Sequence, residues 1–336
     1  MNQDRINLGD FEIAVVLPCF NEEVTIGRTV ADFRAALPGA RVYAYDNNST
    51  DATSARAAEA GAIVRREEDQ GKGNVVRRMF SDIEADVYVM ADGDATYDAA
   101  AAPAMVRRLI ALNLDMVNGA RRHSDAAAYR RGHRFGNRVL TGLVRLFFRR
   151  RFEDMLSGYR VFSRRYVKSF PANSTGFEIE TELTVHALEL RMPTDEMVTE
   201  YRPRPENSSS KLSTYRDGFR ILRMIGCLVK EEKPLQFFSA LAVIVFLPSL
   251  AVFTSVLAEY LATGLVERFP SLFVALSGFV IAALNMVCAL ILDTISRGRR
   301  ETRRLRYLEL PAPGAKLEAA PVPGVHALRR TRPVTA

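Results

Sequence analysis

The stretch VYVMADGDATYD at residues 87–98 shows how the chain is built. An apolar run, VYVMA, is followed at once by Asp92 and Asp94, and by Asp98 four residues later. A buried strand that ends in carboxylates is expected at the carboxyl edge of a parallel sheet, where such sheets bind ligands. Because Asp92 and Asp94 flank a single glycine, both carboxylates can converge on one hard cation such as Mg²⁺ or Mn²⁺. A lone Asp-x-Asp also occurs in ordinary surface turns, so the pattern has weight only together with the rest of the chain.

The region around this stretch alternates short apolar runs with segments of helical period. Strands are expected at 13–19, 41–46, 62–65, 87–92 and 115–120, and helical segments such as 25–37 and 51–61 lie between them. This alternation predicts an α/β domain over 11–205, after a short lead at 1–10, with a mostly parallel, doubly wound, Rossmann-like sheet. No G-x-G-x-x-G follows the first strand, which argues against a dinucleotide-dependent oxidoreductase.

Two later segments are long enough to cross a bilayer. Residues 237–257 and 272–292 each contain 21 residues without a charge, which as a helix is about 31 Å, close to the hydrocarbon core. Two such runs in succession favour a transmembrane hairpin over a pair of buried core helices. Basic residues flank its two ends, whereas the loop between them has only Arg268 beside Glu259 and Glu267. The positive-inside rule therefore predicts a multi-pass protein of the inner (cytoplasmic) membrane, with the α/β domain and both termini in the cytoplasm.

Composition narrows the class of partner. The chain has 336 residues, a net charge of +7 and a pI of about 9.4, which favours an anionic partner. No nucleic-acid recognition motif is present, and the arginines gather beside the apolar segments. The three cysteines are widely spaced, so neither a disulfide framework nor a thiolate metal site is expected. Residues 206–236 are predicted to form basic interface helices, and 297–336 a basic, Pro-rich tail that is disordered.

The ends of the predicted strands carry a recurring kind of sequence. PCFNEE follows the first strand, DNNSTDAT the second, QGKGN precedes a later helix, and DGD follows the strand at 87–92. Each of these could locally be no more than helix capping or a loop. In this order, however, they resemble the nucleotide-sugar half of the family-two inverting glycosyltransferases, which have the GT-A fold.

This resemblance implies roles for individual residues. The nucleoside would contact the first two strand ends, through Pro18, Phe20, Asn21, Glu22 and Asp46. Lys72 and Gly93 would also lie at the donor, and Asp92 and Asp94 would hold Mg²⁺ or Mn²⁺ on the diphosphate. Thr96 stands where many relatives have a glutamine that can ligate the metal, and is counted with the metal site.

Three further motifs point to a more specific group of glycosyltransferases. The segments 156–167, 176–189 and 201–222 are similar to the polyprenyl-phosphate glycosyltransferases, which include dolichyl-phosphate hexose synthases and their undecaprenyl-phosphate counterparts. The likeness covers 11–235 and implies that Arg121, Arg204 and Lys211 bind donor or acceptor phosphates. Arg134, Arg138 and Ser157 would lie near the lipid phosphate, with Arg131 as another register. Asn207 stands where a glycine is expected. The basic amphipathic stretch at 134–152 suits either the membrane interface or an ordinary core-facing helix.

The expected function is transfer of a hexose from a UDP- or GDP-linked sugar to a polyprenyl phosphate, with undecaprenyl phosphate favoured by the Ala- and Arg-rich composition. A phosphate monoester is already anionic at neutral pH, since its second pKa is about 6, so no general base is expected. An acceptor hydroxyl would instead need a base, for which Asp98 and Glu178 are candidates. A third alternative is a catalytically silent nucleotide-sugar sensor. The hairpin could also pack against further copies of itself.

Overall fold

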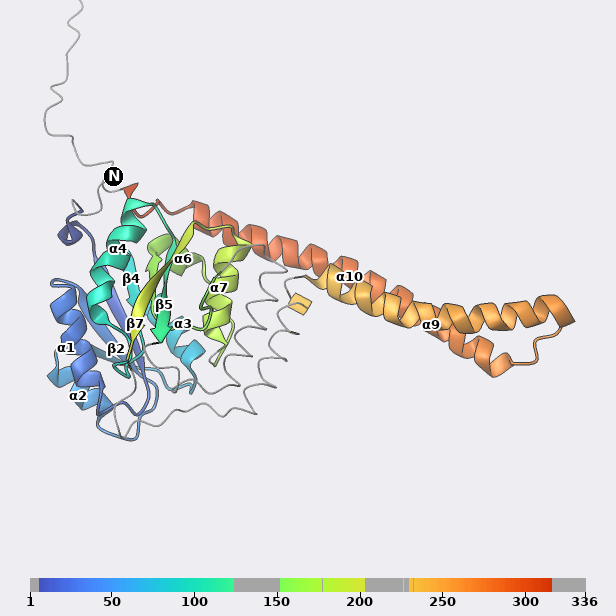
Figure 1. The fold of residues 1–336 in the computed structure, drawn as a ribbon, viewed down its shortest axis with the longest axis horizontal. Coiled ribbons are helices and arrows are strands. Elements are labelled where there is room, and N and C mark those ends of the chain that lie inside the picture. The colour runs from blue at the N-terminus through green and yellow to red at the C-terminus, as the bar shows by residue number, and fades with distance from the viewer. Residues whose placement is uncertain are drawn as a thin grey trace, which may run out of the picture.

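Seven strands form one sheet in the centre of the α/β domain (Figure 1). The computed structural model describes residues 6–123, 152–176, 178–202, 226, 230–231 and 233–315. Within them the sheet order is β3-β2-β1-β4-β6-β5-β7. The strands are β1 (Ile13–Cys19), β2 (Arg41–Asp46), β3 (Ile63–Arg66), β4 (Val87–Met90), β5 (Met116–His123), β6 (Arg160–Ser163) and β7 (Thr194–Tyr201).

The expected strands are confirmed, and two more are present. β1, β2, β3 and β4 are parallel, and β6 runs antiparallel between β4 and β5. β7 pairs with β5 in parallel along its whole length. Because β5 is parallel to β4, the carboxyl ends of β1, β2, β4, β5 and β7 all meet at one edge of the sheet. This is the GT-A-like, mostly parallel sheet that the sequence predicts.

Helices cover both faces of the sheet because alternate strand residues point to opposite sides. Val15 and Leu17 of β1 pack beneath α1 (Ile26–Ala36), α2 (Thr53–Glu59) and α4 (Ala102–Ala111). Val16 of β1 and Met90 of β4 face the other layer, which contains α3 (Lys72–Asp82), α6 (Arg164–Ser169) and α7 (Ile179–Glu189). The described residues also contain two short 3₁₀ helices, η2 (Leu8–Asp10) and η3 (Ala99–Ala101).

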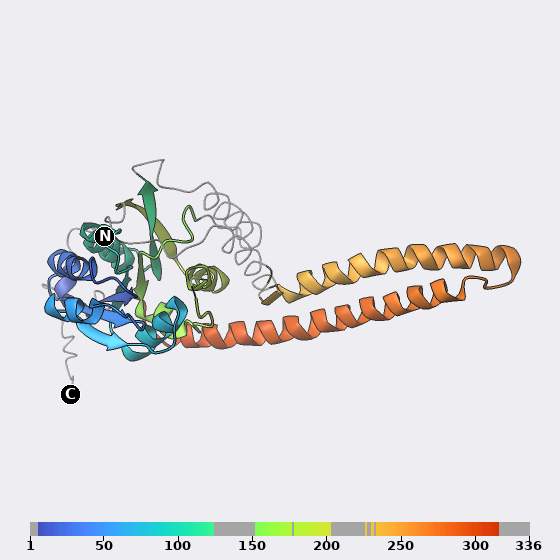
Figure 2. The ribbon, with the colours of Figure 1, turned by 90° about the horizontal axis from the view of Figure 1, so that it is seen from below.

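Two long helices extend away from this domain as an antiparallel pair (Figure 2). They are α9 (Pro234–Thr263) and α10 (Phe269–Leu308), and both are long and apolar enough to cross a membrane. Small residues seven positions apart, Ala275, Ala282 and Ala289, are buried along α10. A Cβ on Gly278 would lie 1.9 Å from Ser249 Oγ, so the helices cross at close range there. Large apolar side chains on the outside are exposed, as expected for surfaces that face lipid.

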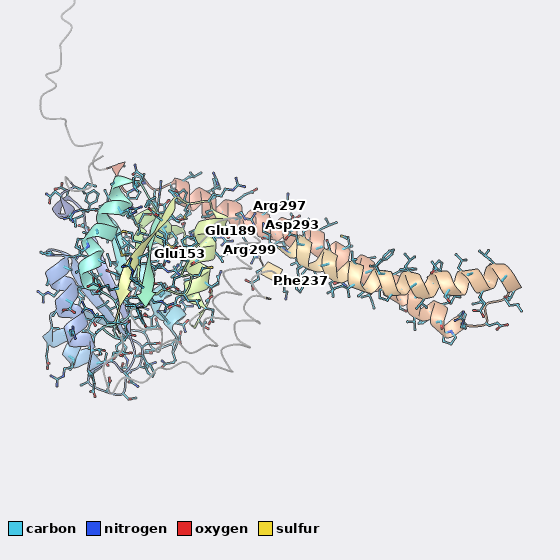
Figure 3. All side chains as sticks on the ribbon, viewed as in Figure 1. Glu153, Glu189, Phe237, Asp293, Arg297 and Arg299 are labelled. Carbon is cyan, nitrogen blue, oxygen red and sulfur yellow. The ribbon has the colours of Figure 1, made fainter. Side chains whose placement is uncertain are left out.

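The C-terminal part of α10 differs from the expectation. A disordered tail was predicted from 297, but α10 continues without a break to Leu308. Its arginines Arg300 and Arg303 reach the carboxylate of Glu189 at the end of α7, near the place where Figure 3 labels Glu189 beside α10. Tyr307 donates a hydrogen bond to Asp115 (2.8 Å). The prediction of disorder is therefore wrong for 297–308, because acidic partners on the domain order this segment; residues 316–336 lie outside the described part.

Candidate active site

The first two strand ends form a connected polar surface. Asp46 ends β2 and accepts hydrogen bonds from the Ser49 backbone N–H (2.9 Å) and the Ser54 hydroxyl (2.6 Å). Asn21 has φ +52°, a conformation that asparagine tolerates better than most residues. It accepts a bond from the Thr50 N–H (2.8 Å), which joins the turn after β1 to the turn after β2.

The other residues predicted to contact the nucleoside lie in the same place. Pro18 is within β1, Phe20 directly follows it, and both side chains are half-buried at the carboxyl edge. The Glu22 backbone N–H donates to the Thr53 hydroxyl (2.8 Å). The structure thus brings Pro18, Phe20, Asn21, Glu22 and Asp46 together at the ends of β1 and β2.

Within the Asp-x-Asp segment, Asp94 is held in place by hydrogen bonds from Thr96. Asp94 is 2% exposed, and its carboxylate accepts bonds from the Thr96 N–H (3.2 Å) and hydroxyl (2.6 Å). Thr96 is fully buried, so in this structure it orients Asp94. Gly93 between the aspartates is closely packed, since a Cβ there would lie 3.0 Å from Cys19 Sγ and 3.2 Å from an Ile26 methyl carbon.

Asp92 is held by Lys72. The Lys72 ammonium lies 2.5 Å from Asp92 Oδ1 and 2.7 Å from Glu180 Oε1. Burial would lower the pKa of Lys72, but the charges of Asp92 and Glu180 outweigh it and raise that pKa above its ordinary value. Lys72 therefore stays protonated and neutralises Asp92. Glu180 was not singled out from the sequence; only the motif at 176–189 pointed to its neighbourhood.

In the turn Gly71–Lys72–Gly73, two backbone N–H groups have partners within the protein, and the Gly71 N–H donates to the Asn47 side-chain oxygen (2.7 Å). The Gly73 N–H donates to the Thr175 carbonyl (3.0 Å). Cβ atoms on Gly71 and Gly73 would lie 2.2 Å from the Thr175 oxygen and 2.0 Å from the Ser174 oxygen. Both glycines are thus needed for close packing of this turn against the segment before α7.

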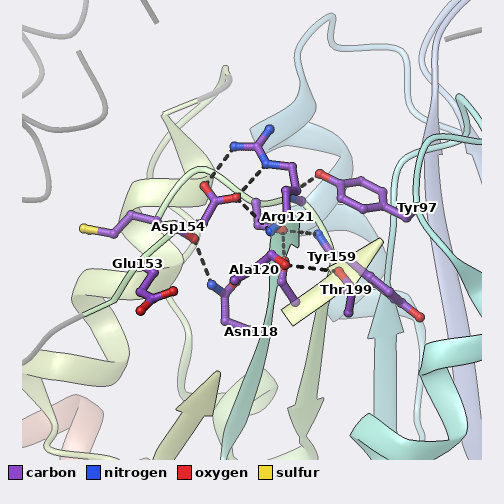
Figure 4. Close-up of polar contacts among 12 residues, drawn as sticks. Tyr97, Asn118, Ala120, Arg121, Glu153, Asp154, Tyr159 and Thr199 are labelled. Carbon is purple, nitrogen blue, oxygen red and sulfur yellow. Dashed lines mark hydrogen bonds and ion pairs between the residues drawn. The ribbon is translucent and has the colours of Figure 1, made fainter. Parts of the chain in front are cut away.

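Arg121 on β5 is fixed by residues that the sequence did not indicate (Figure 4). Its guanidinium forms two bonds with Asp154, Nε–Oδ2 at 2.6 Å and Nη2–Oδ1 at 2.8 Å. It also lies over the Tyr201 ring, 5.5 Å from the centroid. Burial would raise the pKa of Asp154, but the Arg121 bonds prevail and lower it. The Arg121 guanidinium thus lies at the same edge as Asp92 and Asp94, with its charge balanced by Asp154.

Ser157 is placed differently from the expectation. It was expected near the acceptor phosphate, but its side chain is fully buried and its hydroxyl donates to the Gly119 carbonyl (2.6 Å). It supports the backbone of β5 and does not present a hydroxyl to a ligand. The other residues expected on phosphates lie outside the described residues: Arg131, Arg134, Arg138, Arg204 and Lys211.

The residues at this edge fit a divalent metal. In the described part of the chain no group of three His, Cys, Asp or Glu side chains is arranged around one metal position. Asp92 and Asp94 nevertheless supply hard oxygen donors, and Mg²⁺ commonly binds one or two carboxylates together with substrate phosphates. Gly158 leaves space next to Asp92, because a Cβ added at this position would lie 2.8 Å from Asp92 Oδ2. The Gly158 N–H donates to the Tyr97 hydroxyl (2.9 Å), which fixes this space.

Comparison with known proteins agrees with the fold. Residues 14–170 match the family Glycosyl transferase family 2. Glycosyltransferase AglJ of Haloferax volcanii is 31% identical over 300 residues, which cover 88% of this chain and 98% of that protein. Protein RfbJ of Shigella flexneri is 53% identical over 125 residues, 37% of this chain and 97% of that protein. Low-salt glycan biosynthesis hexosyltransferase Agl6 of H. volcanii is 30% identical over 219 residues, 63% of this chain and 52% of that protein.

Solved structures show the same fold. Mannosyl-3-phosphoglycerate synthase from Rubrobacter xylanophilus superimposes with a TM-score of 0.55 and 21% identity, over 67% of this chain and 76% of that one. Glucosyl-3-phosphoglycerate synthase from Mycobacterium tuberculosis, in complex with Mn²⁺, UDP-glucose and phosphoglyceric acid, gives a TM-score of 0.53 and 23% identity, over 66% and 80% of the chains. The near full-length match to AglJ and the match over 14–170 show that this chain belongs to glycosyltransferase family 2.

Proposed function

We propose that this protein transfers a hexose, with inversion, from a UDP- or GDP-linked donor to a polyprenyl phosphate, undecaprenyl phosphate being the favoured acceptor. The donor would lie at the carboxyl edge of the sheet, with its nucleoside beside Asp46 and Asn21 and its diphosphate near Asp92 and Asp94. The similarity to a hexosyltransferase, Agl6, and to a GT-A enzyme seen with Mn²⁺ and UDP-glucose supports this donor class.

The proposal of a lipid acceptor is supported by the continuity of α10. One helix contains the apolar segment at 272–292 and also the arginines that bind the domain at Glu189. From Leu292 to Tyr307 the helix rises roughly 22 Å. The domain is thereby attached to the end of an apolar hairpin, which suits an acceptor whose phosphate lies at the headgroup level of a membrane. We infer from the flanking charges that this is the cytoplasmic face of the inner membrane.

The residues present account for a displacement without a general base. A phosphate oxygen of the acceptor bonds to the anomeric carbon while the bond from that carbon to the donor diphosphate breaks. A divalent cation held by Asp92 and Asp94 would supply charge neutralisation for the leaving diphosphate. Arg121, whose charge Asp154 balances, would lessen repulsion between the two phosphate-bearing substrates by donating hydrogen bonds to one of their phosphates. Arg134, Arg138, Arg204 and Lys211 are proposed for the same purpose.

The candidate bases for a hydroxyl acceptor have other partners. The Asp98 carboxylate caps η3 through the Ala100 N–H (3.3 Å) and pairs with Arg202 (3.5 Å). Glu178 is exposed and accepts a bond from the Gly176 N–H (3.1 Å). A hydroxyl acceptor would require one of these carboxylates to take its proton, whereas a phosphate acceptor would not.

The test is transfer of label into lipid. The full chain in nanodiscs is incubated with undecaprenyl phosphate, Mg²⁺ or Mn²⁺, and radiolabelled UDP- and GDP-sugars. We expect one donor to give an EDTA-sensitive lipid product, and Asp94→Asn to lower its rate by about 100-fold or more. Donor hydrolysis without labelled lipid would indicate a hydroxyl acceptor, and donor binding without turnover would indicate a sensor. Unchanged activity of Asp94→Asn would exclude the metal role.

A further inference from the structure

We propose that Lys72 is the resident cation of Asp92 and competes with the divalent metal for it, and that Glu180 retains Lys72 when the metal binds. This inference rests on the proposed function, because it concerns the same metal site. It assigns Glu180 a positioning role and gives Lys72 a role other than direct contact with the donor.

The geometry shows one ammonium shared by two carboxylates. Lys72 Nζ lies 2.5 Å from Asp92 Oδ1 and 2.7 Å from Glu180 Oε1, and the Lys72 side chain is 8% exposed. Asp92 is the more open acid, with 28% of its side chain exposed, whereas Glu180 has 11%. A cation arriving from solvent therefore meets Asp92, and Lys72 keeps a partner at Glu180 on its buried side.

The backbone of Glu180 is fixed within α7. It lies in the first turn of α7, where the helix dipole stabilises a carboxylate. Its backbone carbonyl accepts bonds from Arg160 Nη2 (3.0 Å) and the Thr184 hydroxyl (3.2 Å), and Arg160 is fully buried. The long side chain of Lys72 can move while Glu180 stays in place.

The position of Lys72 also requires these acids. Lys72 is the first residue of α3, after Gly71 in a positive-φ conformation (+137°). A positive charge at the N-terminus of a helix is unfavourable with respect to the helix dipole. The two carboxylates offset this cost, so loss of either one changes how strongly Lys72 holds the other.

Two substitutions that both remove the Lys72–Glu180 ion pair are therefore expected to change the affinity for Mn²⁺ in opposite directions. Lys72→Met removes the competitor of the metal and leaves Asp92 uncompensated, so Mn²⁺ should bind about tenfold more tightly without donor. Glu180→Gln leaves Lys72 with Asp92 alone, so Mn²⁺ should bind about tenfold more weakly. A purely structural role would make both variants weaker binders.

The experiment measures free Mn²⁺ by electron paramagnetic resonance during titration of the full chain in detergent, with folding checked by thermal melting. The matched control is Lys168→Met, which removes another part-buried lysine that pairs with an acid, Glu84, away from the site; its Mn²⁺ affinity should equal that of the wild type. Weaker or unchanged Mn²⁺ binding by Lys72→Met, or tighter binding by Glu180→Gln, would overturn the inference while leaving the proposed function in place. A wild-type chain that binds no Mn²⁺, with or without UDP- and GDP-sugars, would refute both.

Discussion

Side chains at the candidate site are held by partners that lie far away in the sequence. Lys72 and Glu180 are 108 positions apart, and Arg121 and Asp154 are 33 apart. The sequence could indicate Asp92, Asp94, Asp46 and Asn21, because each lies at the end of a strand or within four residues after it. It could not indicate Glu180 or Asp154, because their roles depend on how separate elements pack and no local spacing records that contact.

Gly158 gives a sharp test of the space above Asp92. In Gly158→Ala the new methyl group would lie 2.8 Å from Asp92 Oδ2 and 3.0 Å from Lys72 Nζ. Both atoms end movable side chains, so we expect the domain to fold while the carboxylate moves. Displacement of a reacting group by about 1 Å can cost about 100-fold in rate, and we expect kcat/KM in the lipid-transfer assay to fall by at least about tenfold.

The control for Gly158→Ala is Gly27→Ala in α1, where the nearest atom to the new Cβ would be 3.8 Å away. Its kcat/KM and melting temperature should match the wild type or exceed it slightly. Full activity of Gly158→Ala would show that the position of Asp92 is not critical.

At the scale of elements, the apolar part of α10 was predictable and its basic part was not. The charge-free run at 272–292 indicates a spanning helix by length alone. In the sequence, the arginines after this run resemble the basic residues that commonly flank a membrane-spanning helix. In the structure, Arg300 and Arg303 bind Glu189, whose side chain is only 1% exposed. Glu189 also ends α7, where a negative charge is unfavourable with respect to the helix dipole, so the two arginines compensate it.

Glu189→Gln should release the end of α10 from the domain. Breaking a fully buried ion pair costs about 3–5 kcal/mol, and the cost here should be smaller because Arg300 is 34% exposed. The arginines at 297–306 are trypsin sites that the docked helix protects, so initial cleavage there should be faster in the variant. Glu309→Gln, which breaks an exposed pair with Arg306, is the control and should be cleaved like the wild type. Equal protection of Glu189→Gln would exclude a docking role for this pair.

His186 on α7 makes the stability of the same region sensitive to pH. Burial, together with the positive charge of Arg303, lowers the pKa of His186 from 6.5 to about 3. The unfolded chain binds a proton at this histidine below about pH 6.5 and the folded chain does not, so stability is lost as the pH falls from 6.5 towards 3. At pH 5 the loss should be about 2 kcal/mol.

Thermal melting at pH 7 and pH 5 tests this expectation. The melting temperature of the wild type should fall between the two, and His186→Gln, whose amide can still reach the Ser169 hydroxyl that contacts the His186 Nε2 atom (3.1 Å), should fall less. An equal decrease in both proteins would mean that other groups carry the acid sensitivity.

For the whole molecule, the sequence predicted the sheet class and the hairpin but not the two strands that complete the sheet. β6 has the sequence RVFS, and its arginine is fully buried with backbone and threonine partners. β7, TDEMVTEY, is half-buried and acidic. Neither shows the apolar run that marks β1 and β4. Both are strands because of tertiary pairing, which single-chain patterns do not show.

The topology of the hairpin can be tested by cysteine labelling in intact spheroplasts. In a background without Cys227 and Cys288, Glu267→Cys in the loop between α9 and α10 should react with a membrane-impermeant maleimide. Glu301→Cys, exposed on the basic part of α10, should react only after the membrane is permeabilised. The reverse pattern would place the domain on the other side of the membrane.

The central claim, that the acceptor is a lipid phosphate, is tested most directly by a matched pair of acceptors. The wild-type chain in nanodiscs is given its radiolabelled donor, a divalent metal, and either undecaprenyl phosphate or undecaprenol, which differ only in the phosphate. We predict an acid-labile labelled lipid with undecaprenyl phosphate and none with undecaprenol, because an anionic phosphate attacks without a general base and a hydroxyl does not. Transfer to undecaprenol at a comparable rate, lost in Asp98→Asn, would contradict the account and assign a hydroxyl acceptor with Asp98 as the base.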